Sequence, residues 1–237
     1  VISYLSEHSD TLKGILYAIT IILALLPFRT MIRNEISNVM NGEKLTDFAV
    51  LQKYLWIAVL GLGAAFSLNF GMGLFSVVSN STGYQQVADA QYGVSFFIGL
   101  FLYGVVSPVT EEIIYRGITY QRLKRTFGVI PAMLISALIF GGLHGNWVQA
   151  VYGTLMGILL AWVYEKYAGF LAPVLVHMAA NLGVYSITYG SRLAGLSRNT
   201  CIMATIVSVL ITGVCFWRLN CRMSQSAGMM HNEGKKP

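Results

Sequence analysis

The chain has 237 residues, of which 55% are hydrophobic and 11% are charged, with 16 Lys and Arg against 10 Asp and Glu. An average soluble domain is about a quarter charged, and so few charged groups cannot cover the surface of a water-soluble protein of this size. The composition therefore excludes an ordinary soluble domain, a disordered chain and a disulfide scaffold. The three cysteines have no metal-binding spacing, and a membrane protein remains.

Stretches without Asp, Glu, Lys or Arg predict the membrane spans, because roughly 20 apolar residues cross a bilayer as a helix. The stretch 126–164 is long enough to cross twice, with a turn at Gly145-Asn146-Trp147. Pro108 lies inside the third predicted helix and predicts a kink or a new helical segment there. The prediction is an all-α, polytopic transmembrane helix bundle of about seven spans, near residues 11–28, 54–78, 92–121, 130–146, 149–164, 170–190 and 200–217.

Small residues recur at helical spacing in Gly153, Gly157 and Ala161, which lets a neighbouring helix approach closely. The simplest interpretation is that they pack the bundle. No second domain is evident. Residues 1–223 are predicted to form a single transmembrane domain with a catalytic core at about 92–190, followed by a polar cytoplasmic tail at 224–237.

The distribution of Lys and Arg predicts the orientation in the membrane. One set of alternating loops holds 12 of these residues and the other set holds three. Cytoplasmic loops carry the excess of positive charge, so the richer set is expected in the cytoplasm. The prediction is a multi-pass protein of the cell membrane with the N-terminus of this sequence outside and its C-terminus in the cytoplasm.

Five ionisable groups fall inside predicted spans, where a charge costs a few kcal/mol or more. They are Glu111, Glu112, Arg116, His144 and His177. Glu112 and Arg116 are four residues apart, so they share a helix face and can form an ion pair. Glu111 is rotated by about 100° from Glu112 and faces elsewhere.

Together these groups have the chemistry to activate water. Glu111, left free by the pairing of Glu112 with Arg116, is a candidate general base. One histidine can orient the water, while the other and Asn181, four residues after His177, can donate hydrogen bonds to an oxyanion. Alternatively, Zn²⁺ takes His and carboxylate ligands, with Glu111, Glu112, His144 and His177 as candidates. Taken singly, each histidine, Arg116 and Asn181 has a structural interpretation, but their occurrence on three spans at compatible depth favours a functional one.

At these residues the chain resembles a known family. Residues 111–116 match the Glu-Glu-x-x-x-Arg motif of the CPBP family, the CAAX proteases and bacteriocin-processing enzymes. Residues 140–144 match its Phe-x-x-x-His motif, and residues 177–181 its His-x-x-x-Asn motif. The three motifs occur in the family's order over about 70 residues.

The resemblance implies an intramembrane endopeptidase with a conical active-site cavity in a helical bundle. By the family's pattern, Glu111 activates water together with His144, His177 and Asn181 stabilise the oxyanion, and Glu112 and Arg116 support them. Family members act on prenylated C-termini or process bacteriocins and other peptides. The expected partners are a membrane-associated peptide or protein substrate and the lipid bilayer, and not nucleic acid. No cofactor is expected other than Zn²⁺, which would make the enzyme a metalloprotease.

Other intramembrane protease chemistries are excluded by the motifs. The aspartates at 10, 47 and 89 lie outside the spans, so an aspartyl dyad is excluded, and neither a His-Glu-x-x-His helix nor a rhomboid Gly-x-Ser-Gly motif occurs. Two alternatives from other classes stay open. One is a non-catalytic bacteriocin-immunity or scaffold protein. The other is a proton-coupled transporter that uses Glu111, Glu112 and His144 as a relay.

Overall fold

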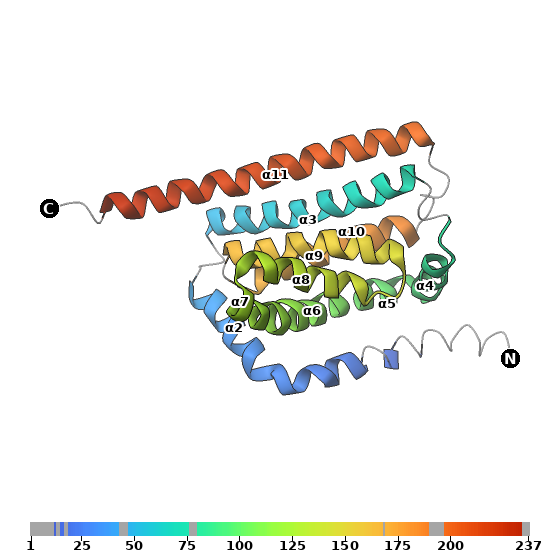
Figure 1. Cartoon of the computed structure of the whole chain (residues 1–237), viewed down its shortest axis with the longest axis horizontal. Coiled ribbons are helices and arrows are strands. Elements are labelled where there is room, and N and C mark those ends of the chain that lie inside the picture. The colour runs from blue at the N-terminus through green and yellow to red at the C-terminus, as the bar shows by residue number, and fades with distance from the viewer. Residues whose placement is uncertain are drawn as a thin grey trace.

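The computed structural model describes residues 12, 15–16, 19–42, 47–75, 80–167, 169–189 and 197–233. Within this part of the chain the regular elements are helices, most of which lie side by side along one direction (Figure 1). This arrangement confirms the predicted all-α helix bundle. The elements are η1 Leu26–Phe28, α2 Arg29–Gly42, α3 Phe48–Leu74, α4 Thr82–Tyr92, α5 Phe96–Phe101, η2 Leu102–Val106, α6 Ser107–Glu112, η3 Ile113–Tyr120, α7 Gln121–Phe127, α8 Val129–Gly142, α9 Trp147–Tyr167, α10 Leu171–Tyr189 and α11 Arg198–Glu233.

Five helices in the described part are long and apolar enough to cross a membrane. They are α3, the continuous helix Phe96–Phe127, α9, α10 and the Arg198–Cys221 part of α11. The predicted span at 130–146 is wrong in length, because α8 has 14 residues and is about 21 Å long, short of the roughly 30 Å hydrocarbon core. The predicted span at 11–28 lies only partly within the described residues.

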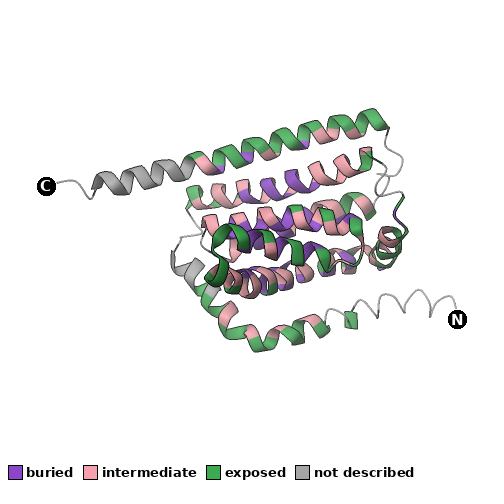
Figure 2. Ribbon diagram, in the orientation of Figure 1, coloured by how far each residue is buried: buried purple, intermediate pink, exposed green. Residues whose placement is uncertain are grey.

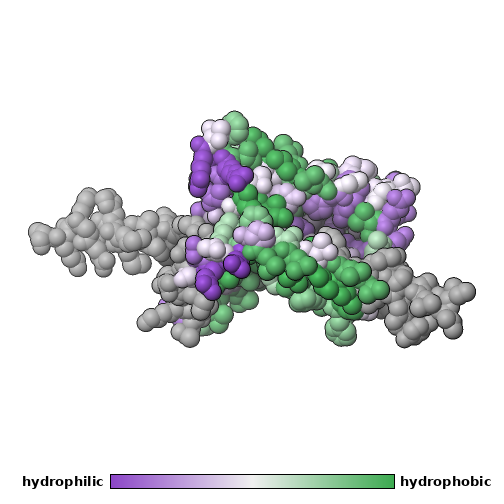
Figure 3. Space-filling model, turned by 90° about the horizontal axis from the view of Figure 1, so that it is seen from below, coloured by the Kyte–Doolittle hydropathy of each residue, from purple (hydrophilic) through white to green (hydrophobic). Residues whose placement is uncertain are grey.

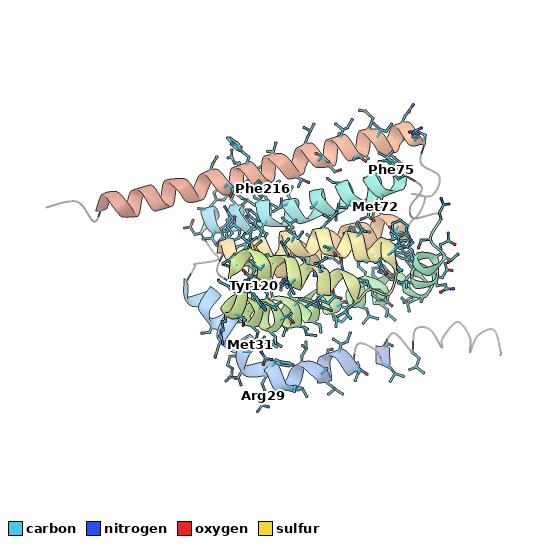
Figure 4. The ribbon with its side chains drawn as sticks, viewed as in Figure 1. Arg29, Met31, Met72, Phe75, Tyr120 and Phe216 are labelled. Atoms are coloured by element: carbon cyan, nitrogen blue, oxygen red, sulfur yellow. The ribbon has the colours of Figure 1, made fainter. Side chains whose placement is uncertain are left out.

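The bundle has two unlike ends. The basic end holds the start of α3, the end of α7, the end of α9 and residue Cys221 of α11, and most of the described Lys and Arg lie there. The opposite end, called the α4 end below, holds α4, the turn between α8 and α9, and the end of α10. Figure 4 labels Met72 near the α4 end and Tyr120 near the basic end.

Side-chain caps start several of the described helices. Asp47 accepts a hydrogen bond from the Ala49 amide at the start of α3, and Ser81 accepts one from the Tyr84 amide at the start of α4. Asn146 accepts one from the Gln149 amide at the start of α9. Such caps satisfy amides that the first helical turn leaves without partners. The polar helix α4 was not predicted, whereas the predicted turn at residues 145–147 is confirmed.

The helix Phe96–Phe127 changes its winding around Pro108. Residues Leu102–Val106 and Ile113–Tyr120 are wound as π-helix, and Ser107–Glu112 between them is α-helix. The Ser107 amide bonds to the Leu102 carbonyl, five residues back. Proline has no amide hydrogen to continue this pattern to Tyr103, and π-helical turns occur often at functional sites. The predicted change at Pro108 is thus confirmed as a change of helical winding.

Glycines bring α8 and α9 close together. A Cβ atom on Gly157 would lie 2.9 Å from the Ala137 Cα, and one on Gly141 would lie 2.4 Å from the Ala150 carbonyl oxygen. Both distances are closer than side chains tolerate. The packing role predicted for Gly153 and Gly157 is confirmed.

The apolar surface is distributed as a bilayer requires. The core centres on α3, α9 and α10, where Leu60, Leu160 and Val176 are fully buried. In contrast, α11 exposes most of its large apolar side chains (Figure 2), including Leu210 and Trp217. On the face shown in Figure 3, hydrophobic residues cover much of the surface and strongly hydrophilic ones gather toward the ends. Membrane helices expose apolar side chains to lipid in this way.

Candidate active site

The Glu112 carboxylate and the Arg116 guanidinium form a fully buried ion pair. Arg116 Nη1 donates to Glu112 Oε1 at 2.9 Å, and the two side chains are 1% and 0% exposed. Arg116 Nη2 donates to the Gly157 carbonyl oxygen at 3.1 Å, which the missing side chain at Gly157 leaves accessible. The predicted pairing four residues apart is confirmed, even though Arg116 lies on the π-helical stretch η3.

His177 lies between the two glutamates. Its Nδ1 is 2.8 Å from Glu112 Oε1, and its Nε2 is 3.6 Å from Glu111 Oε2. A neutral ring that donates from Nδ1 to Glu112 presents the unprotonated Nε2 toward Glu111, since a histidine's second nitrogen takes its role from the bond the first one makes. The cluster therefore contains two carboxylates, one guanidinium and an imidazole, and a proton on His177 would make it neutral.

Glu111 is the carboxylate that faces open space. Its side chain is 26% exposed, and it lines a cavity of about 290 Å³ that the fully buried Glu112 does not reach. Ser107 Oγ donates a hydrogen bond to Glu111 Oε1. The prediction that the two adjacent glutamates face different surroundings is confirmed. Ser107 was not singled out from the sequence, although a serine four residues before a glutamate shares its helix face.

His144 lies in the turn after α8, and its predicted position on a membrane-spanning helix is wrong. The chain leaves α8 at Gly142 and turns at Gly145, whose φ of 78° favours glycine. The ring of His144 remains next to the helix because its Nδ1 is 2.8 Å from the Phe140 carbonyl oxygen, one of those that a helix end leaves free. If Nδ1 donates this bond, Nε2 can accept another. His144 lines the same cavity as Glu111.

Asn181 has a partner that the sequence did not indicate. Its Nδ2 donates to the Tyr103 carbonyl oxygen at 2.9 Å. In the π-helical pattern the amide of residue 108 would donate to this carbonyl, but Pro108 has no amide hydrogen. Asn181 also lines the cavity. An amide nitrogen carries two hydrogens, so one secures the π-helical turn and one is left for another acceptor.

The Phe140 ring separates the two histidines. It makes edge-to-face contacts with His144 and His177, with ring centres 5.0 and 5.7 Å apart, and the Arg116 guanidinium lies 4.8 Å from its centre. The ring thus fixes the imidazole planes and also covers the buried ion pair. Each of the six predicted site residues is therefore within one connected cluster, with Glu112 and Arg116 behind the cavity wall and the other four along it.

The donor atoms do not form a metal-binding set in the described part of the chain, where no three His, Cys, Asp or Glu side chains are arranged to hold a metal. Glu112 Oε1 contacts both Arg116 and His177 Nδ1. Two of the four candidate metal ligands, Glu112 and His177, are therefore already in contact with each other. The Zn²⁺ alternative stays a prediction, and the mechanism below uses no metal.

Comparison with known proteins agrees with the motifs. Residues 93–183 match the profile of the family described as type II CAAX prenyl endopeptidase Rce1-like. A Bacillus subtilis protein named "Putative membrane peptidase YdiL" is 27% identical over 181 residues, which cover 73% of this chain and 70% of that protein. The "UPF0177 protein YxdF" of Lactococcus lactis is 24% identical over 111 residues, covering 46% of this chain and 59% of that protein. No solved structure matches.

The matched segment contains all three motifs, together with Ser107, which donates to Glu111, and His177, whose Nε2 lies 3.6 Å from it. Neither the family description nor the names of the relatives specify a metal, so the metalloprotease prediction is not supported by them. The predicted resemblance to the CPBP family is confirmed by the family match over residues 93–183 and by the relative named as a membrane peptidase.

Proposed function

We propose that the chain is an intramembrane endopeptidase that hydrolyses a peptide bond in a membrane-associated peptide or protein, of the CAAX or bacteriocin-processing type, with water activated by Glu111. The observation that carries the proposal is the arrangement of the two adjacent glutamates. Glu112 is neutralised by Arg116 behind the wall, and Glu111 faces the cavity together with His144, His177 and Asn181.

In the first step, Glu111 takes a proton from a water molecule that His144 Nε2 holds as acceptor. The resulting hydroxide oxygen bonds to the carbonyl carbon of the scissile peptide. The Ser107 hydroxyl holds Glu111 Oε1 in place, which leaves Oε2 to receive the proton. A general base must lie within hydrogen-bond reach of the proton it removes, and both side chains line the same cavity.

In the second step, the negative charge on the former carbonyl oxygen is stabilised by N–H donors. Asn181 provides the hydrogen that Tyr103 does not use, and His177 provides Nε2–H when its ring is protonated. Such preoriented donors are effective because they need no rearrangement as the charge develops. The carbon–nitrogen bond then breaks as Glu111 returns its proton to the leaving nitrogen, which yields a carboxylic acid and an amine.

We place the protein in the cell membrane with its basic end in the cytoplasm. This orientation puts the N-terminus of this sequence outside and its C-terminus inside. Its support is the clustering of Lys and Arg around the ends of α7, α9 and the membrane-spanning part of α11, with Lys124, Lys166 and Arg218 as examples. Cytoplasmic loops of membrane proteins carry such an excess.

The proposal is tested by purified protein in liposomes, with membrane peptides as candidate substrates. Glu111→Ala and His144→Ala should each abolish cleavage. Cleavage by both variants at the wild-type rate would contradict the proposal. Full biological activity of Glu111→Gln in cells would instead favour the immunity or scaffold alternative.

A further inference from the structure

The cavity at Glu111 extends toward one end of the bundle only. Glu111 lies 15 residues after the start of α5, which places it about 20 Å from that end, near the middle of its helix. The cavity wall continues from Glu111 to residues near the end of α3 and on α4, including Asn69, Tyr84 and Gln91. Residues near the start of α3 and on α7 do not line it. The substrate path therefore leads to the α4 end.

The α4 end carries almost no net charge, whereas the other end is basic. Of the Lys and Arg residues that the structure describes, Arg198 at the start of α11 is the one that lies at the α4 end. The negative charge of Asp89 on α4 balances its positive charge in the sum for this end. The basic end holds Arg33, Lys53, Arg122, Lys124, Arg125, Lys166 and Arg218. By the positive-inside rule, the α4 end faces away from the cytoplasm, and the cavity opens with it.

The cavity wall also limits the substrate. Away from Glu111 and the histidines, its polar groups are amides such as Asn69 and Gln149 and phenols such as Tyr84 and Tyr92. Burial raises the pKa of Tyr84, and that of Tyr92 to about 12, so these phenols stay neutral. The described lining residues include no Lys or Arg. A free substrate carboxylate would meet Glu111 without a counter-ion, whereas amides and phenols suit the polar groups of a peptide backbone.

We infer that the substrate is an uncharged, extended segment of an exported peptide or membrane protein on the outer side of the membrane, cut at an internal peptide bond. This inference rests on the proposed endopeptidase function and narrows its substrate class. It places cleavage outside the cytoplasm and away from a free C-terminal carboxylate.

The side on which the cavity opens is tested by labelling with a membrane-impermeant maleimide in spheroplasts. The full chain carries alanine at positions 201, 215 and 221, and then either Gln86→Cys on α4 or Thr126→Cys on α7. Both residues are exposed and uncharged, so neither change alters the charge distribution. Gln86→Cys should be labelled in intact spheroplasts, and Thr126→Cys only after permeabilisation. The reverse pattern would overturn the inference.

The substrate class is tested with the native cysteines in place, by mapping new protein N-termini in cells with the wild-type chain or with Glu111→Ala. Termini that depend on Glu111 should lie in uncharged segments outside the cytoplasm, at least several residues before the C-terminus. Glu111-dependent termini in cytoplasmic segments, or at the last few residues, would overturn the inference while supporting the protease. If no terminus depends on Glu111, the proposed function fails as well, and the labelling still reports the orientation by itself.

Discussion

Glu111 and Glu112 are neighbours in the chain but belong to different regions of the molecule. Glu112 and Arg116 form a buried layer, called the dry layer below. Glu112 Oε1 accepts a hydrogen bond from the guanidinium and lies 2.8 Å from His177 Nδ1. Glu111 lies in the cavity wall, held by Ser107 and 26% exposed. The rotation between adjacent helical positions separates a buried, paired charge from one that faces the cavity. His177 contacts both, so the dry layer can set the position of the group that faces the cavity.

The largest expected difference in stability is between the same substitution at these two positions. Glu112→Gln leaves Arg116 as an unpaired buried charge, which should lower the free energy of unfolding by about 3–5 kcal/mol. Glu111→Gln keeps a hydrogen-bond acceptor for Ser107 and should change it by less than about 1 kcal/mol. Unfolding of both variants in the same detergent checks this. Equal losses would contradict the separation into two regions.

The packing behind the dry layer gives the next largest effect. Gly141→Ala places a Cβ atom 2.4 Å from the Ala150 carbonyl oxygen and should cost about 1–3 kcal/mol. Gly142→Ala is a matched control, since a Cβ there has no atom within 4 Å. The difference between their melting curves measures how closely α8 must approach α9. A more stable Gly141→Ala variant would show that the approach is not required.

The smallest effect is expected at the basic end. Lys124 Nζ lies 2.6 Å from Glu165 Oε1 and joins α7 to α9, but the lysine is 35% exposed. Exposed ion pairs contribute about 0–1 kcal/mol, so Lys124→Met should change the unfolding free energy by no more than that. A loss comparable to that of Glu112→Gln would mean that this end, and not the dry layer, holds the helices together.

Local spacing was enough to predict one part of the site. The pairing of Glu112 with Arg116 depends on a separation of four residues, which also brings side chains together on the π-helical stretch that follows Glu112. The common location of the three motifs followed from the cost of placing ionisable groups in the membrane. Each of these inferences needs only the helical repeat of the chain and the fact that the surrounding medium is a lipid bilayer.

Other features depend on contacts that spacing does not encode. Asn181 bonds to Tyr103, 78 residues away, at the carbonyl to which residue 108 would donate in the π-helical pattern if it were not proline. The position of His144 in a turn depends on where α8 ends, and a run of apolar residues does not mark that point. The helix α4 has a polar composition with no apolar run, so a search for membrane spans passes over a wall of the cavity.

The central claim is that Glu111 activates the water that hydrolyses the peptide bond. The most direct test is the cleavage rate of one mapped substrate by purified wild-type protein and Glu111→Gln in the same liposomes, with folding checked by unfolding curves. We predict a loss of kcat of about 10²- to 10⁴-fold with KM and stability nearly unchanged. Cleavage by folded Glu111→Gln at the wild-type rate would contradict the account.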